Sequence, residues 1–68
     1  MGSGSLLDVQ MKKLSNAWVN PLGNLIRFYS WEDCSIGEIV VFERHTYVVV
    51  ELKAEFNKNC KYYEAILA

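Results

Sequence analysis

Two apolar stretches separated by a short polar segment form the strongest pattern in the chain. Residues 39–42 and residues 47–52 are dense in β-branched and aromatic side chains, which favour a pleated sheet over a helix. The polar segment between them, residues 43–46, has the length of a hairpin loop, so the sequence predicts a β-hairpin. In the second strand, the side chains predicted to face the core are Val48, Val50 and Leu52.

Further strands are predicted on both sides of this hairpin. Residues 25–31 are rich in β-branched and aromatic residues, and residues 61–67 are predicted to be a final strand pairing with the one before it. Residues 20–24 and 57–59 are polar turns, because proline, glycine and asparagine favour tight turns. One face of the strand at residues 25–31 carries Ile26 and Phe28, and the other carries Leu25, Arg27, Tyr29 and Trp31.

Residues 6–18 fit two different patterns. Apolar residues recur at helical spacing, which favours a helix with one apolar stripe. Residues 7–12 also alternate between apolar and polar, which favours a strand. We favour the helix, because its stripe covers more of the segment, and we keep the strand as the alternative. The stripe, which is also a candidate dimer contact, consists of Leu7, Met11, Leu14 and Trp18.

Length and composition indicate one small domain with a real core. A chain of 68 residues buries only about 60% of its unfolded surface, but 51% of the residues are hydrophobic. Residues 1–5, Met-Gly-Ser-Gly-Ser, indicate a leader added for expression, which leaves residues 6–68 as the domain. The predicted fold class is α+β or mainly β, a curled antiparallel sheet of four to five strands or a small barrel. One N-terminal helix or strand packs on that sheet.

Charge and hydropathy restrict the classes of partner. The net charge of −1 argues against a general nucleic-acid binder, which normally carries a positive excess. No apolar run approaches the roughly 18 residues that span a bilayer, and no signal peptide is visible. Without a secretory signal, Cys34 and Cys60 are expected to be reduced thiols, and the chain is expected to be cytoplasmic.

The candidate chemical groups point to binding rather than catalysis. His45 is the single histidine and lies in the predicted hairpin loop, and the two cysteines have no closely paired zinc ligands beside them. We therefore expect no metal, no cofactor and no enzymatic activity; a thiol-dependent enzyme using Cys34 or Cys60 with His45 is the weakest hypothesis. Arginine, tyrosine and tryptophan are enriched in interface hot spots. The candidate binding residues are Arg27, Tyr29, Trp31 and Tyr47.

The hairpin region resembles a known type of fold. The run Ile36-Gly37-Glu38-Ile39-Val40-Val41-Phe42, a short turn and then Tyr47-Val48-Val49-Val50-Glu51 resemble the opening of many SH3-like small barrels. This resemblance implies binding to proteins, peptides or nucleic acids rather than catalysis. In size and lack of motifs the chain also resembles orphan proteins of phages and other mobile elements. The leading hypothesis is a non-catalytic protein-interaction module, which could act as a homodimer; the alternative is a small-barrel nucleic-acid binder.

Overall fold

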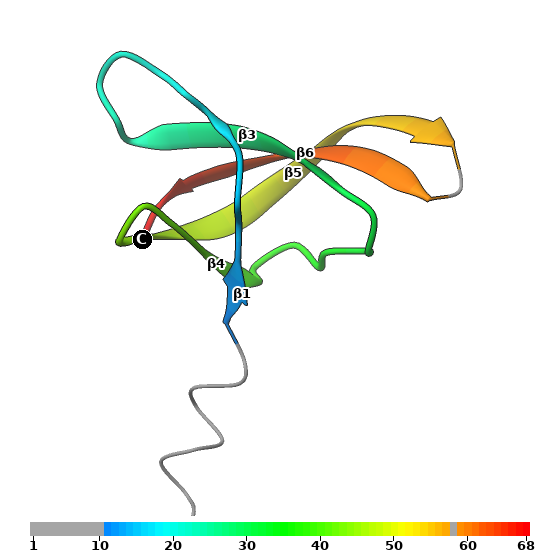
Figure 1. Ribbon diagram of the computed structural model, residues 1–68, viewed down its shortest axis with the longest axis horizontal. Coiled ribbons are helices and arrows are strands. Elements are labelled where there is room, and N and C mark those ends of the chain that lie inside the picture. Colours follow the sequence, from blue (N-terminus) through cyan, green and yellow to red (C-terminus); the bar gives the residue numbers. More distant parts are fainter. Residues whose placement is uncertain (1–10, 58) are drawn as a thin grey trace, which may run out of the picture.

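The protein forms a single six-stranded sheet. Its structure, a computed structural model, describes residues 11–57 and 59–68. The strands lie in the order β1-β4-β5-β6-β3-β2, and all neighbours are antiparallel except β1 and β4, which are parallel (Figure 1). The described residues form no helix. The strands are β1 (Lys12–Lys13), β2 (Trp18–Val19), β3 (Leu25–Ser30), β4 (Ile39–Phe42), β5 (His45–Asn57) and β6 (Cys60–Leu67).

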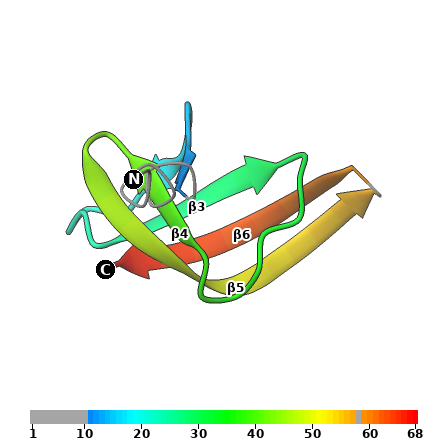
Figure 2. The same ribbon diagram turned by 90° about the horizontal axis from the view of Figure 1, so that it is seen from below.

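The sheet is curled into a half-barrel, and the chain order explains why. β1 and β2 lie at opposite edges of the sheet but are joined by only residues 14–17. In a flat sheet the outermost of six strands would be roughly 24 Å apart, whereas the five steps from Lys13 to Trp18 reach at most about 18 Å. The sheet must therefore bend until its edges approach, and Figure 2 shows β4 out of the plane of β3 and β6. This curled, mainly β architecture is compatible with the predicted small barrel. The sheet has six strands rather than the four to five expected, and it is mixed because β1 and β4 are parallel.

The core lies inside the curl. Ile26 and Phe28 of β3 share one face, as the alternation of that strand predicted, and both are fully buried. Phe28 stacks on Tyr63 of β6, with ring centroids 5.7 Å apart. Leu14 and Ala17, between β1 and β2, pack against the same core from the edge. The complete buried apolar cluster is Ile26, Phe28, Cys34, Val40, Phe42, Tyr47, Val49, Tyr63 and Ala65.

The predicted hairpin is confirmed, but the face assigned to its second strand was wrong. β4 and β5 pair as expected around a turn at Glu43 and Arg44. The buried side chains of β5 are Tyr47 and Val49, whereas Val50 and Leu52 are 37% and 38% exposed and Val48 is half-buried. Because this run is apolar on both faces, alternation cannot identify the inner one. The pairing register, set by the hairpin turn, decides it.

The helix expected at residues 6–18 is also wrong for the residues that the structure describes. Residues 11–19 are extended and contain β1 and β2, while residues 6–10 lie outside the described part. Each short strand is fixed by pairing with a sheet edge, Lys12 opposite Val40 and Trp18 opposite Arg27. These backbone hydrogen bonds to distant strands outweigh the weak local preference for a helix. Most of the alternation on which the strand alternative rested, residues 7–10, lies outside the described part, and only its end at residue 12 coincides with a strand, β1.

The hairpin of β5 and β6 is long and strongly twisted. Its register shifts three times, between Val49 and Glu51, between Leu52 and Ala54, and between Glu55 and Asn57. Each shift adds one extra residue on β5, which is a β-bulge, and bulges bend a strand and increase its twist. The twisted end of this ribbon extends beyond β4, as Figure 1 shows. The three inserted residues are Val50, Lys53 and Phe56.

Candidate binding groove

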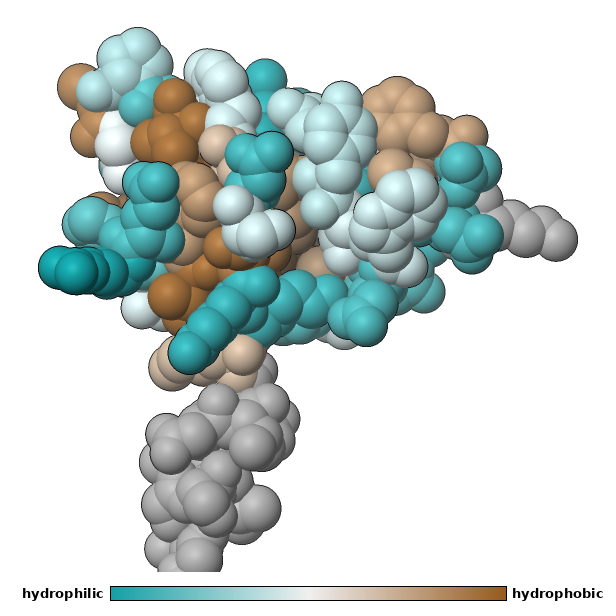
Figure 3. Space-filling view, viewed as in Figure 1, coloured by the Kyte–Doolittle hydropathy of each residue, from teal (hydrophilic) through white to brown (hydrophobic). Residues whose placement is uncertain are grey.

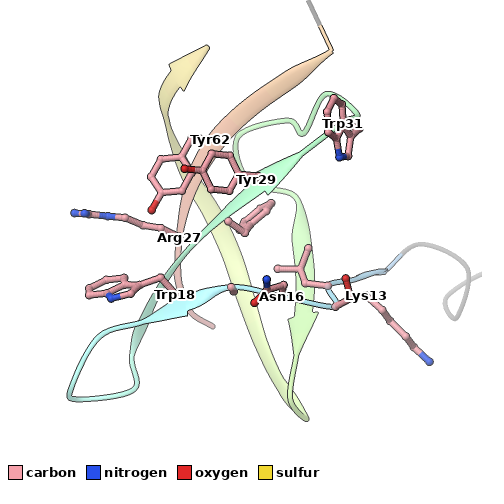
Figure 4. A pocket seen from close by; sticks show the side chains of 11 residues that line it. Lys13, Asn16, Trp18, Arg27, Tyr29, Trp31 and Tyr62 are labelled. Carbon is pink, nitrogen blue, oxygen red and sulfur yellow. The ribbon is translucent and has the colours of Figure 1, made fainter. Parts of the chain in front are cut away.

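A groove runs along the edge of β3 that faces β2, beside the segment that connects β1 to β2. Its volume is about 550 Å³. Cross-strand pairing places its side chains, because Trp18 lies opposite Arg27 and Tyr29 lies opposite Tyr62, and directly opposite residues share a face. Figure 4 shows these four side chains beside β3 and Trp31 at its far end. The lining residues are Lys13, Leu14, Ser15, Asn16, Ala17, Trp18, Arg27, Phe28, Tyr29, Trp31 and Tyr62.

An aromatic cluster of Tyr29, Phe56 and Tyr62 borders the groove. The ring centroids of Tyr29 and Tyr62 are 4.6 Å apart, and those of Tyr29 and Phe56 are 5.5 Å apart. Phe56 is a bulge residue of β5, so its side chain is free of the strict alternation of that strand. Tyr29 is 61% exposed and Phe56 is 58% exposed. The molecule thus presents contiguous aromatic surface to solvent.

Arg27 is held in place between aromatic and acidic groups. Its guanidinium carbon lies 5.4 Å from the centroid of the Trp18 ring, a cation–π contact. Its Nε donates to Glu64 Oε1 at 3.1 Å, and Lys53 Nζ lies 3.9 Å from the same oxygen. The Glu64 carboxylate is mostly shielded from solvent, so this ion pair orients Arg27 and Trp18 toward the groove.

The groove is locally cationic on a molecule of net charge −1. Two of its lining residues, Lys13 and Arg27, are basic, and none is acidic. Arg27 is balanced by Glu64, whereas Lys13 makes no ion pair with any carboxylate in the described part of the chain. In Figure 4 the Lys13 side chain points away from the aromatic residues toward solvent. The rim of the groove can therefore attract an acidic group.

Three of the four candidate binding residues come together here. Arg27, Tyr29 and Trp31 line the groove, and Trp31 is 73% exposed. Tyr47 does not join them, because it is buried in the core and its hydroxyl lies 3.4 Å from the carbonyl oxygen of Gly23. Tyr62 also lines the groove; its residue type had marked it as a possible hot spot, but it was not one of the four candidate binding residues. Its position follows from the pairing of β6 with β3, which alternation within one strand cannot reveal.

The three described residues of the expected dimer stripe do not form one exposed stripe. Trp18 lines the groove, Leu14 packs against the core, and Met11 is exposed near the start of β1. Leu7 lies outside the described residues. Because residues 11–19 do not form a helix, side chains spaced three or four residues apart do not share one face there. Trp18 therefore belongs with the groove residues.

The face shown in Figure 3 mixes apolar and hydrophilic side chains. Brown and white side chains lie beside one another over the strands, with teal side chains scattered among them. A wholly polar face would leave little apolar area to bury against a partner. Folded proteins usually have mixed surfaces of this kind, so the mixture by itself does not mark an interface.

The histidine and the two thiols make separate local contacts. His45 is exposed, and its Nδ1 lies 3.0 Å from the carbonyl oxygen of Glu43 in its own turn. Cys34 and Cys60 are free thiols, and Cys34 is buried with Ser30 Oγ 3.8 Å from its sulfur. Neither cysteine contacts His45 in the described part of the chain. Residues 11–57 and 59–68 also contain no group of three or more acidic, histidine or cysteine side chains able to hold a metal ion.

Lys12 links β1 to the loop after β3. Its Nζ lies 3.1 Å from Glu32 Oε1 and donates to Cys34 Sγ at 3.6 Å. Partial burial lowers the pKa of this ammonium, but the hydrogen bonds and charges of Glu32 and Cys34 outweigh it. The net effect is a pKa above the ordinary 10.5.

A second hollow lies on the other side of the same loop. It has a volume of about 350 Å³ and is bordered by Cys34, Leu52 and Lys61. The Lys61 ammonium donates to the Asp33 carboxylate, and this hydrogen bond raises the Lys61 pKa above 10.5. Among its described lining residues Tyr63 is the single aromatic one, so the hollow offers less aromatic surface than the groove.

Comparison with known proteins gives no family assignment. In the described part of the chain, no helix is long and apolar enough to cross a membrane. No family model matches the chain, and no curated protein or solved structure matches it either.

Proposed function

We propose that the protein is a non-catalytic interaction module that binds a partner protein through the groove along β3. The observation that carries this proposal is the gathering of Trp18, Arg27, Tyr29, Trp31 and Tyr62 around one hollow. These are the residue types that dominate binding energy at protein interfaces. Trp31 and Tyr29 are largely exposed and thus have apolar area to bury against a partner.

Nucleic-acid binding is the second candidate, because exposed aromatic rings can stack bases. The cluster of Tyr29, Phe56 and Tyr62 is the feature that favours it. However, the nearby cations are shared with acids, since Arg27 pairs with Glu64 and Lys53 lies 3.7 Å from Glu51. Phosphate contacts require unshared positive charge. A protein partner is therefore favoured, and a salt titration of oligonucleotide binding separates the two candidates.

The test uses peptides selected for binding to the whole protein from a random linear display library. Trp31→Ala is expected to weaken the selected peptides by about 2 kcal/mol, or roughly thirtyfold in Kd, as for an interface hot spot. Leu22→Ala is the control, because Leu22 is 82% exposed in the turn before β3 and does not line the groove. The folded state of each variant is checked by thermal unfolding. Equal binding by Trp31→Ala and Leu22→Ala would place the binding surface elsewhere.

Several finer expectations from the sequence stay proposals. We propose that the curled sheet is an SH3-like barrel, that the chain acts in the cytoplasm, and that it originates from a phage or other mobile element. Homodimerisation is also a proposal, supported by near-neutral charge and exposed apolar side chains. Size-exclusion chromatography with light scattering tests it, and a constant monomer mass across concentrations would reject it.

A further inference from the structure

The backbone of β3 has a definite orientation on its two sides. In an antiparallel pair, successive residues point their N–H and C=O groups alternately toward one neighbour and then the other. The Leu67 N–H donates to the Asn24 carbonyl on the β6 side, and the Asn20 N–H donates to the Leu25 carbonyl on the β2 side. The groups of Leu25, Arg27 and Tyr29 therefore point away from β6.

On that outward side β3 is longer than its partner. β2 contains only Trp18 and Val19, which pair with Arg27 and Ile26. Before Trp18 the chain turns away toward β1, and the groove opens in the space it leaves. The next outward-pointing residue of β3 is Tyr29. Tyr29 has no partner residue on β2. In the described part of the chain, no turn, loop or side-chain hydrogen bond uses its N–H as donor or its C=O as acceptor.

We propose that the groove binds an extended acidic peptide segment, which adds to the sheet as a short strand at Tyr29. This inference rests on the proposed function and specifies the partner. The segment lies beside β3, where β2 would lie if that strand began several residues before Trp18. One of its residues exchanges two hydrogen bonds with the N–H and C=O of Tyr29, as in strand addition to an open sheet edge.

The side-chain preferences follow from this pairing. A residue directly opposite Tyr29 shares its face, so its side chain lies beside Tyr29 and Tyr62 and next to Trp18. An apolar or aromatic side chain fits that position. The acidic preference follows from Lys13, which lines the groove and makes no ion pair in the described part of the chain, whereas Arg27 is shared with Glu64.

A peptide fits this edge better than a nucleic acid does. The distinctive feature is an N–H donor and a C=O acceptor on one residue, presented as a strand edge presents them. Another polypeptide backbone supplies the matching pair at the same spacing, whereas a phosphate or sugar backbone offers mainly acceptors. Oligonucleotide binding at this groove would therefore overturn the proposal.

The experiment uses one selected linear peptide, an N-methyl scan of its backbone and the amide exchange of Tyr29. Methylation of the amide that faces Tyr29 is expected to weaken binding by roughly tenfold, the scale of one lost hydrogen bond. Methylation one residue away, where the amide points to solvent, is the matched control and is expected to have little effect. The Tyr29 amide is expected to exchange more slowly in the complex. Lys13→Gln is expected to weaken an acidic peptide and to reduce the salt dependence of its binding.

The outcomes separate this inference from the proposed function. If Trp31→Ala weakens binding as expected but every N-methyl peptide binds equally and Tyr29 exchange is unchanged, strand addition is wrong and the groove remains a binding site. If Trp31→Ala has no effect, the proposed function fails and this inference fails with it. Selected peptides without acidic residues, or unaffected by Lys13→Gln, would overturn the charge preference.

Discussion

At the scale of single residues, ion pairs hold the loop after β3 in place. Lys12 contacts both Glu32 and the buried Cys34 from β1. The Cys34 N–H also donates to the Tyr63 hydroxyl at 2.9 Å, which connects the loop to β6. These contacts tie a polar loop to two strands that are far apart in sequence. The loop is therefore fixed at the end of β3 where Trp31 borders the groove.

The Lys12 contacts give a pH dependence with a definite sign. The pKa of Lys12 in the folded protein lies above 10.5, so the folded state binds the proton more tightly than the unfolded chain. This contribution is fully present below pH 10.5 and is lost as pH rises through the folded pKa. It should be at most about 1 kcal/mol, because Glu32 is largely exposed and solvent screens the pair.

The measurement is the urea unfolding free energy of the wild type and of Lys12→Met from about pH 8 to pH 12. The difference between the two proteins is expected to narrow at the alkaline end. Taking the difference removes the titration of tyrosines and other lysines, which both proteins share. A difference that stays constant over this pH range would show that the ion pair does not stabilise the fold.

At the scale of elements, the β4–β5 hairpin carries strain in its turn. Glu43 and Arg44 have φ angles of 49° and 72°, in the left-handed region that disfavours most side chains. A two-residue hairpin turn with both φ values positive is of type I′, for which Asn-Gly is the preferred sequence. The protein thus forms the correct turn with residues that are poorly suited to it.

Replacing the turn residues should therefore stabilise the protein. The double variant Glu43→Asn, Arg44→Gly is expected to gain about 1 kcal/mol, because it relieves the strain at both positions. In a domain of this size that gain corresponds to a rise in Tm of roughly 4–8 °C. Arg44→Ala is the control, since alanine keeps the strained φ and removes only the charge. If the two variants have the same Tm, the change in charge rather than the backbone conformation determines the gain in stability.

The elements also show which parts of the fold the sequence can predict. The dense β-branched stretches at residues 39–42 and 47–52 predicted the hairpin correctly, because their composition excludes a helix. The inner face of the second stretch was not predictable, since valines occupy both faces and a bulge follows Val49. The helix at residues 6–18 was wrong because β1 and β2 exist only through pairing with distant strands.

The groove, too, could be predicted only as far as local sequence patterns reach. Alternation along residues 25–31 predicted that Arg27, Tyr29 and Trp31 share one face, and all three line the groove. Tyr62 and Phe56 join this face through the register of β6 against β3 and a bulge in β5. Both features depend on long-range pairing, for which a single sequence contains no direct signal. Local patterns therefore predicted the centre of the site and missed its border.

At the scale of the whole molecule, the curl of the sheet depends on a short segment that connects its two edge strands. Residues 14–17 connect β1 at one edge to β2 at the other, and the Leu14 N–H donates to the Val41 carbonyl at 2.8 Å. Leu14 also packs against the core, while Ser15 and Asn16 face solvent. This connecting segment, residues 14–17, both closes the half-barrel and forms one wall of the groove. Weakening it should therefore affect stability and binding together.

Leu14→Ala tests this coupling against the same substitution at an exposed position. Because Leu14 is only partly buried, the loss of stability should be about 1–2 kcal/mol, below the 2–5 kcal/mol typical of fully buried leucines. Leu22→Ala, at a highly exposed turn residue, should change stability by less than about 0.5 kcal/mol. Urea unfolding measures both, and hydrogen exchange should show faster opening of β1 and β4 than of β5 and β6 in Leu14→Ala. Uniform opening of all strands would instead mean that the edges unfold only with the whole sheet, and the groove wall could not move independently.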